Sequence, residues 1–272
     1  MTLQRYLTRL LGGYELVQDH TWPHRASAVL EVRDATGARW FVKRHSSTER
    51  YRAERDAYHD WVPVLGERAP MLRDSDDQLR VLVLTPTPGR PVVDADVSTH
   101  HQAGALLRRL HAARPAQVWP EFGAERSAEL QRWSAAAAGL LERRVLDFAR
   151  SEVTAAAQLP PPDKVVCHFD YSPRNWLAHE GVVSVLDFEW CRLDVWVNDL
   201  TRLCFGSWIG HPELQEAFLQ GYGRPTLTPA EDQILAASGA VRAIELVVRA
   251  RQYGERALEE SSRQALTRLM RR

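Results

Sequence analysis

The sequence predicts an α+β fold of two lobes, in which a small β-rich lobe precedes a larger, mainly helical lobe. Three observations predict this arrangement. The first eighty or so residues contain short runs rich in β-branched and aromatic residues. A stiff connector with three prolines and a glycine follows at 85–91, and beyond it apolar residues recur at helical spacing. We therefore expect an N-terminal lobe over residues 1–86 and a C-terminal lobe over residues 87–272.

The N-terminal lobe should contain a hairpin followed by a helix. Residues 28–32 and 39–43 are β-like and flank a glycine-containing turn. Ser46 is expected to cap the helix, with Glu49 completing a capping box. Residues 79–84 predict a further strand. One face of the helix would then carry a stripe made of Tyr51, Glu54, Ala57, Tyr58 and Trp61.

The C-terminal lobe should be mainly helical, with a small β-like insertion. Helical patterns run over 102–113, over 127–158 as one or two helices, and from 195 to the end of the sequence. Two short β-like segments lie between them, at 164–167 and 182–186. The second lobe therefore carries two short strands among its helices.

Composition and charge exclude several classes of protein. The 272 residues are 44% hydrophobic and 26% charged, which is ordinary for a globular chain. The formal net charge is zero, so no global field favours nucleic acid or an anionic membrane. Neither a signal peptide nor a run of roughly 18 apolar residues is present. The three cysteines lack metal-site spacing and are expected to be free thiols in the cytoplasm, in a monomer or homodimer.

The strongest chemical signal is the pattern H-x-D-x-x-x-x-N, which runs from His168 through Asp170 to Asn175 after a predicted strand. Asp187 ends the next β-like segment. Phosphoryl transfer needs a carboxylate beside the acceptor hydroxyl and oxygen ligands for Mg²⁺. A hairpin that brings Asn175 and Asp187 together would supply those ligands. The alternative is that Asp170 and Asn175 only stabilise turns.

Further segments extend this pattern, and together they resemble the aminoglycoside phosphotransferase and choline kinase-like superfamily. The resemblance implies a bilobal protein-kinase-like fold with ATP or GTP between the lobes. The residues that carry it are 83–90, 107–111, 167–177, 185–189 and 198–200.

The resemblance assigns roles residue by residue. It makes Asp170 the catalytic aspartate and makes Asn175 and Asp187 the Mg²⁺ ligands. It makes Asp199 a structural support of the catalytic loop. His168 is expected to brace the same loop, because phosphoryl transfer depends on positioning and charge more than on a histidine base.

Lys43 is one of two lysines in the chain, beside Lys164, and all other basic residues are arginine. Such a lysine indicates a site that needs a compact ammonium group. The resemblance makes it the contact of the α- and β-phosphates. Its expected partner is Glu54, because a carboxylate on the apolar stripe of the following helix requires a cation.

The remaining nucleotide contacts are less defined by the sequence. Leu84, Thr85 and Thr87 would present backbone groups to the purine. The loop over residues 19–27 lacks glycine, so its phosphate contacts stay open. Candidates in that loop are His24, Arg25 and Ser27. Glu189 has either a metal-assisting role or a surface or hydrogen-bonding role.

The acceptor is expected to be a small molecule with a hydroxyl, bound by the helical segments after residue 115. Neither 115–160 nor 201–272 is rich in acid, as a polycation would require. We expect an antibiotic acceptor, of the aminoglycoside, nucleoside or macrolide type. The alternatives are a metabolic kinase for choline, homoserine or a sugar, and a pseudokinase. Core packing or a flat acceptor would explain the many aromatic residues, which are Trp119, Phe122, Trp133, Trp176, Trp196, Phe205, Trp208 and Tyr222.

Overall fold

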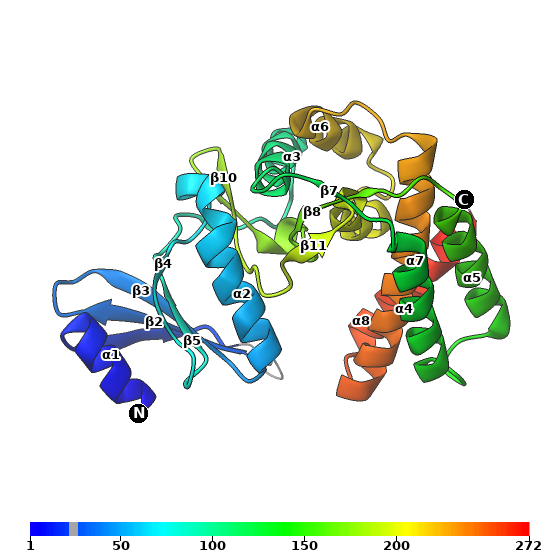
Figure 1. Cartoon of the computed structure of the whole chain (residues 1–272). Helices are drawn as coiled ribbons and strands as arrows, with labels where there is room; N and C mark the ends of the chain where they lie inside the picture. The colour runs from blue at the N-terminus through cyan, green and yellow to red at the C-terminus, as the bar shows by residue number, and fades with distance from the viewer. Residues whose placement is uncertain (22–26, 272) are drawn as a thin grey trace.

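The structure is a computed structural model that describes residues 1–21 and 27–271. Its N-terminal part is an antiparallel sheet of five strands in the order β1-β2-β3-β5-β4. Two helices pack with the sheet, namely α1 (Leu3–Leu11) and α2 (Thr48–Asp60) (Figure 1). The strands are β1 (Tyr14–Asp19), β2 (Ser27–Asp34), β3 (Arg39–His45), β4 (Leu72–Asp76) and β5 (Val81–Leu84).

The predicted hairpin is the pair β2–β3, and the predicted strand at 79–84 is β5. The predicted cap of α2 is wrong by one residue. Ser47 is the N-cap, because its extended backbone lets its hydroxyl accept from the Arg50 amide. Arg50 therefore stands at the third helical position, where a capping box needs an acid. The expected buried stripe is confirmed for Tyr51, Glu54, Ala57 and Tyr58.

Two small antiparallel sheets connect the N-terminal sheet to the helices. Their orders are β10-β9-β6 and β11-β8-β7. A 3₁₀ helix, η1 (Val62–Arg68), precedes β4. The division predicted between residues 86 and 87 lies between β5 and β6 and remains a proposal. The six strands are β6 (Arg90–Pro91), β7 (Gln117–Val118), β8 (Asp163–Cys167), β9 (Trp176–His179), β10 (Val182–Val185) and β11 (Arg192–Asp194).

The C-terminal part is helical, as predicted. The α-helices are α3 (Val97–His111), α4 (Phe122–Ala136), α5 (Arg143–Ala157), α6 (Pro212–Tyr222), α7 (Pro229–Tyr253) and α8 (Arg256–Leu269). The short helical turns are η2 (Pro173–Asn175), η3 (Trp196–Leu200) and η4 (Leu203–Ser207). Helix α7 starts with a capping box, in which Thr228 and Glu231 bond each other's backbone amides.

Helices α3 and α6 touch backbone to backbone at two glycines. A Cβ on Gly104 would lie 2.0 Å from the carbonyl oxygen of Phe218, and one on Gly221 would lie 1.9 Å from that of His101. No side chain fits at either place, because both obstacles are main-chain atoms. These two glycines therefore fix how closely α3 and α6 approach.

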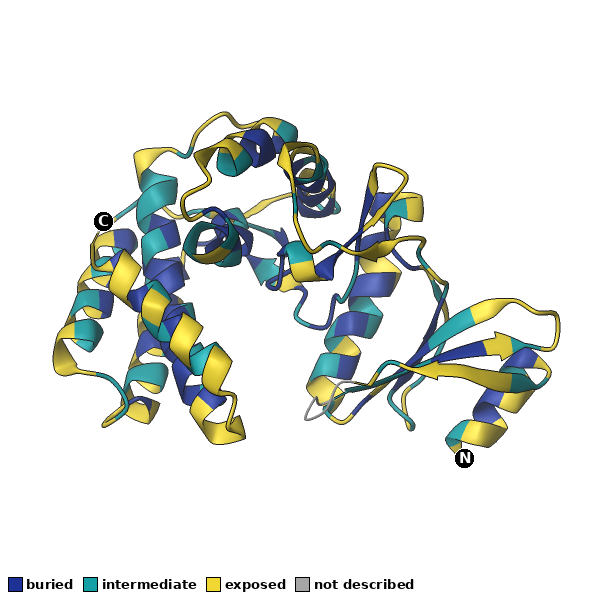
Figure 2. Ribbon diagram, turned by 180° about the vertical axis from the view of Figure 1, so that it is seen from behind, coloured by how far each residue is buried: buried dark blue, intermediate teal, exposed yellow. Residues whose placement is uncertain are grey.

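The buried residues form two clusters. A small one lies between α1 and the N-terminal sheet and includes Tyr6, Leu7 and Val83. The large one reaches from α2 through α3 to the middle of α7, where the ribbons are darkest (Figure 2). Among the described residues no helix combines the length and apolar character needed to cross a bilayer. The large core thus holds the segment from His168 to Asn175, the predicted catalytic loop, against α3 and α7.

Candidate active site

A cleft of about 350 Å³ lies between the five-stranded sheet and the small sheets. Its walls come from β2, β3, β5 and α2 on one side and from the segments around Asn175 and Asp187 on the other. Apolar side chains line it and suit a flat purine, namely Val29, Phe41, Pro70, Leu84, Leu177 and Leu186.

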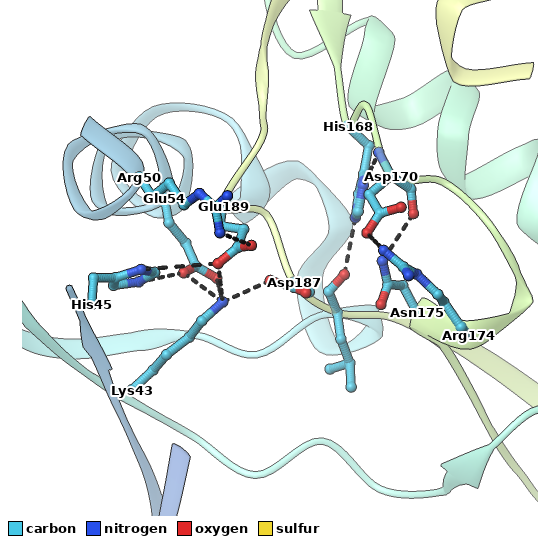
Figure 3. Close-up of polar contacts among 11 residues, drawn as sticks. Lys43, His45, Arg50, Glu54, His168, Asp170, Arg174, Asn175, Asp187 and Glu189 are labelled. Carbon is cyan, nitrogen blue, oxygen red and sulfur yellow. Dashed lines mark hydrogen bonds and ion pairs between the residues drawn. The ribbon is translucent and has the colours of Figure 1, made fainter. Parts of the chain in front are cut away.

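Lys43 lies at the back of this cleft and contacts three carboxylates. Its Nζ is 2.8 Å from Glu54 Oε2, 2.6 Å from Asp187 Oδ1 and 3.5 Å from Glu189 Oε2. Figure 3 shows Glu54 reaching Lys43 from α2 and Asp187 reaching it from the opposite side. The structure therefore forms the pair that the sequence predicts, and it adds Glu189 to the cluster.

The cluster keeps Lys43 and Asp187 charged. Burial alone lowers the pKa of Lys43, but Asp187, Glu54 and Glu189 outweigh it and raise that pKa well above its ordinary value. Burial raises the pKa of Asp187, but the charge and hydrogen bond of Lys43 outweigh it and lower the pKa to about 2. Burial also raises the pKa of Glu189, with Lys43 opposing and the nearby acids adding to the rise.

Glu189 and its neighbours connect α2 to the strand-end segment. Glu189 Oε1 accepts from Arg50 Nη1 at 3.4 Å. His45 lies between the acids, with Nε2 2.8 Å from Glu54 Oε2 and Nδ1 3.9 Å from Glu189 Oε2. Glu189 is buried, so the surface role considered for it is wrong.

The catalytic loop is anchored by Asp199, which is almost fully buried. Its carboxylate accepts from the backbone amides of His168 at 2.8 Å and Phe169 at 2.5 Å. His111 of α3 contacts the same carboxylate at 2.9 Å through Nε2, and its Nδ1 meets the Tyr222 hydroxyl. The backbone of Phe169 has a φ of 66°, a strained value that such anchoring can hold.

His168 braces the loop from inside. Its Nε2 lies 2.9 Å from the carbonyl oxygen of Leu186, which can only accept, so Nε2 carries the proton. Its Nδ1 then accepts from the Asp170 amide at 3.3 Å. Both ring nitrogens are thus engaged with the backbone, and one of them ties the loop to the residue before Asp187.

Asp170 is 1% exposed and is held by two arginines that sequence reasoning missed. Arg174 pairs with its Oδ2, and Arg202 Nε lies 2.5 Å from its Oδ1. Arg174 precedes Asn175 inside the motif, and its i,i+4 spacing from Asp170 is a signal that was available. Arg202 follows η3, and nothing in its sequence context indicates this pairing.

Asn175 and Asp187 fit a magnesium site. Both side chains line the cleft. Asn175 donates its Nδ2 to the Asp170 carbonyl at 2.9 Å, which turns its Oδ1 toward other partners. Asp187 uses Oδ1 for Lys43, and its φ of 66° is again strained. One amide oxygen and one carboxylate oxygen are the kind of ligands that Mg²⁺ takes from a protein.

The predicted nucleotide contacts Ser27, Leu84, Thr85 and Thr87 all line the cleft. Thr85 is partly engaged elsewhere, because its amide donates to the Met71 carbonyl and its hydroxyl accepts from the Met71 amide. The Thr87 hydroxyl is buried and has no hydrogen-bond partner among the described residues. It therefore suits a ligand contact.

Two loop candidates, His24 and Arg25, lie outside the described residues.

A second cavity of about 230 Å³ is lined by Ser172, by the segment from Thr201 to Gly206, and by α7 and α8. Arg202 in its wall pairs with Asp170. The polar lining of this cavity consists of Arg202, Arg242, Ser172, Thr201, Ser261 and Ser262.

The eight aromatic residues noted in the sequence are mainly core. Trp119, Phe122, Trp176, Trp208 and Tyr222 are buried. Phe205 lines the second cavity. Core packing therefore explains most of the aromatic content of the second lobe.

Comparison with solved structures shows the same α+β kinase-like fold over nearly the whole chain, which confirms the predicted fold class. A macrolide 2'-phosphotransferase, MphH from Brachybacterium faecium, is 17% identical with a TM-score of 0.67, covering 97% of this chain and 96% of that one. The aminoglycoside phosphotransferase APH(4)-Ia is 12% identical with a TM-score of 0.73, covering 99% and 97%. A gentamicin complex of APH(2")-IIa is 12% identical with a TM-score of 0.67, covering 98% and 96%.

A search of curated protein sequences found no match. The model of the phosphotransferase enzyme family matches residues 23–235. This span includes Lys43, the catalytic loop and Asp187, which the structure gathers around one cleft. It covers most of the chain, so the family resemblance predicted from the motifs is confirmed. The chain belongs to the phosphotransferase enzyme family.

Proposed function

We propose that this protein transfers the γ-phosphoryl group of ATP or GTP to a hydroxyl group of a small molecule. The observation that carries the proposal is the convergence of Lys43, Asn175 and Asp187 on one cleft, with Asp170 directly behind it. Apolar walls for a purine and two oxygen ligands for a cation are the parts that such a donor requires. A related structure contains ADP together with hygromycin B, which supports the same two-substrate arrangement.

In the proposed reaction the acceptor oxygen forms a bond to the γ-phosphorus while the bond from that phosphorus to the bridging β–γ oxygen breaks. The hydroxyl proton passes to a carboxylate oxygen of Asp170, and the nucleoside diphosphate leaves. Asp170 is suited to orienting the hydroxyl, because its own amide and the anchored loop fix its position. Lys43, held by Glu54, would contact the α- and β-phosphates.

Asn175 and Asp187 would hold Mg²⁺, which neutralises charge on the phosphates when it is bound. Arg174 is placed to add a second positive charge, because it lines the cleft and also pairs with Asp170. The protein thus offers charge stabilisation on both sides of the transferred group.

For the acceptor we propose an antibiotic hydroxyl, since the similar solved structures include aminoglycoside and macrolide phosphotransferases. A metabolic small-molecule kinase is the second candidate. The size of the second cavity favours it, because about 230 Å³ falls below the roughly 300–1,000 Å³ of sites for drug-sized ligands. A pseudokinase is disfavoured, because each group that the reaction needs is present around the cleft.

The test is a screen for ADP or GDP release against libraries of antibiotics and metabolites, with mass spectrometry to detect one added phosphate on the acceptor. Asp170→Asn is the matched inactive variant, and we expect it to lower turnover at least about 1,000-fold with nucleotide affinity retained. Near-normal turnover of that variant would remove Asp170 from its role. Nucleotide binding without phosphate transfer to any acceptor would favour the pseudokinase.

A further inference from the structure

The second cavity carries an unusual charge for a site that would take a polycation. Arg202 and Arg242 are the charged residues that line it, and none of its described lining residues is an acid. The other polar groups are hydroxyls, and the rest of the wall is apolar. A ligand with several ammonium groups would meet two fixed guanidinium charges here, and arginine does not lose its proton to accommodate them.

The acids behind the cavity are already paired with arginines. Glu245 Oε2 accepts from Arg242 Nη1 at 2.5 Å, and Glu245 Oε1 accepts from Arg249 Nε at 2.8 Å. Burial raises the pKa of Glu245, but Arg242 and Arg249 outweigh it and lower that pKa. Asp170 is shared in the same way by Arg174 and Arg202. Each of these two carboxylates is therefore already shared by two guanidinium groups, so neither is free to meet a cationic ligand.

The Ser172 hydroxyl marks where a ligand would lie. Ser172 is 8% exposed, lines the cavity, and has no hydrogen-bond partner among the described residues. It stands two residues after Asp170, so a ligand that bonds Ser172 would lie beside the proposed catalytic carboxylate. A buried hydroxyl without a partner costs free energy, and a bound polar ligand would recover it.

We propose that the acceptor is a compact hydroxy acid, whose acidic group pairs with Arg202 and Arg242 while its hydroxyl faces Asp170. This inference rests on the proposed phosphotransferase function, names the charge class of its acceptor, and favours the second candidate, a metabolic small-molecule kinase, over an antibiotic kinase. The acidic group is a carboxylate or a phosphate ester, because guanidinium groups bind both through paired hydrogen bonds. The cavity volume of about 230 Å³ suits a compact molecule.

The same pairing has a consequence for Asp170. Arg202, which lines the second cavity, has its Nε 2.5 Å from Asp170 Oδ1, and Arg174 pairs with Oδ2. An acceptor anion competes with Asp170 for Arg202. Binding of the acid thus releases Oδ1 to take the hydroxyl proton, so uncharged acceptors leave Asp170 paired.

The test measures binding without turnover, using the full-length protein with Mg²⁺ and ADP. Calorimetry compares galacturonate with galactose for the carboxylate arm, and glycerol phosphate with glycerol for the phosphate arm, within a wider panel of hydroxy acids and their uncharged partners. Kanamycin and gentamicin form the polycation arm. We expect acids of at least one arm to bind about tenfold or more tightly than their partners and than the polycations.

Variants link that selectivity to the cavity. Arg242→Gln should lower the affinity for the acid about tenfold or more and leave its uncharged partner unchanged, whereas Arg242→Lys should keep part of the preference. Arg143→Gln makes the same charge change on exposed α5, at a side chain that is 94% exposed, and should have no effect. Retained ADP affinity verifies that each variant is folded.

Two results overturn the inference. One is equal or tighter binding of polycations or uncharged partners, and the other is failure of every acid in the panel to bind. Unchanged acid affinity in Arg242→Gln would also reject the assigned contact. Acids that bind in this way but never receive phosphate would reject the phosphotransferase proposal and leave the charge selectivity standing.

Discussion

Around Lys43 one ammonium group contacts three carboxylates, whereas around Asp170 one carboxylate contacts two guanidinium groups. The two clusters lie on opposite sides of the strand-end segment that contains Asp187 (Figure 3). One carries excess negative charge and the other carries excess positive charge.

The difference indicates what each cluster is built to receive. Buried charges in excess are unfavourable unless a ligand of the opposite sign completes them. The acidic cluster suits a metal cation with its nucleotide, and the basic one suits the transferred phosphoryl group and an anionic acceptor. A free protein that holds both imbalances therefore stores part of its substrate specificity in these two charge imbalances.

The largest expected effect comes from the acidic cluster. Asp187→Asn removes the carboxylate that would hold Mg²⁺. We expect kcat/KM to fall about 1,000-fold and the Mg²⁺ concentration needed for half-maximal activity to rise. Steady-state kinetics across a Mg²⁺ titration measures both. Asp147→Asn on exposed α5 is the control, since its carboxylate pairs with surface arginines. A variant that keeps the original Mg²⁺ dependence would contradict the assignment.

Replacing the Lys43 ammonium group tests the contribution of positive charge to the same cluster. Lys43→Met leaves Glu54 buried with no ammonium partner, so we expect stability to fall by about 3–5 kcal/mol and kcat/KM to fall about 100-fold. Denaturant unfolding and kinetics measure the two losses separately.

The double variant Lys43→Met/Glu54→Gln distinguishes these two roles. It should recover part of the stability, because the unpaired carboxylate is gone, and it should recover no activity. Recovery of activity along with stability would show that Lys43 acts through folding alone.

In the basic cluster, Arg174→Gln removes one of the two charges on Asp170. We expect kcat to fall about tenfold with little change in the KM for nucleotide, since the guanidinium is placed to stabilise charge on the transferred group. The control is Arg144→Gln, whose side chain is 72% exposed. A rise in KM with kcat unchanged would instead assign Arg174 to nucleotide binding.

The smallest effect is expected at Asp34, a carboxylate that belongs to neither charged cluster. Asp34 accepts from the Thr36 hydroxyl, the Trp40 ring and two backbone amides, and these bonds lower its pKa to about 2. Its stabilising effect should be complete above about pH 4, the unfolded value, and should disappear as pH falls through about 2. The difference in unfolding free energy between the wild type and Asp34→Asn should therefore shrink at acid pH, and a constant difference would contradict this.

Short sequence patterns predicted those parts of the site whose residues lie close together in the chain. The motif from His168 to Asn175 and the strand-end Asp187 located the proposed catalytic loop and metal ligands in the sequence, and the structure brings Asn175 and Asp187 to one cleft. The pairing of Lys43 with Glu54 followed from a buried helix stripe, because a carboxylate there needs a cation.

The contacts that sequence reasoning missed depend on packing between distant elements. Arg202 reaches Asp170 because η3 lies beneath the catalytic loop, and α8 closes the second cavity against α7. The helix α1 and strands β1 and β4 were not predicted either. The predicted cap of α2, Ser46, was wrong by one residue, because the backbone conformation and hydrogen bond that make Ser47 the N-cap are visible only in the structure.

The contact of α3 with α6 has a practical consequence for changing the acceptor. Gly104 and Gly221 each meet a main-chain oxygen of the other segment. A methyl side chain at either position would therefore push α3 and α6 apart. Helix α3 also carries His111, which contacts the carboxylate that anchors the catalytic loop. Mutant libraries for altered substrate range should therefore leave the α3–α6 pair intact and vary the α7 and α8 walls, where side chains rather than backbones define the space.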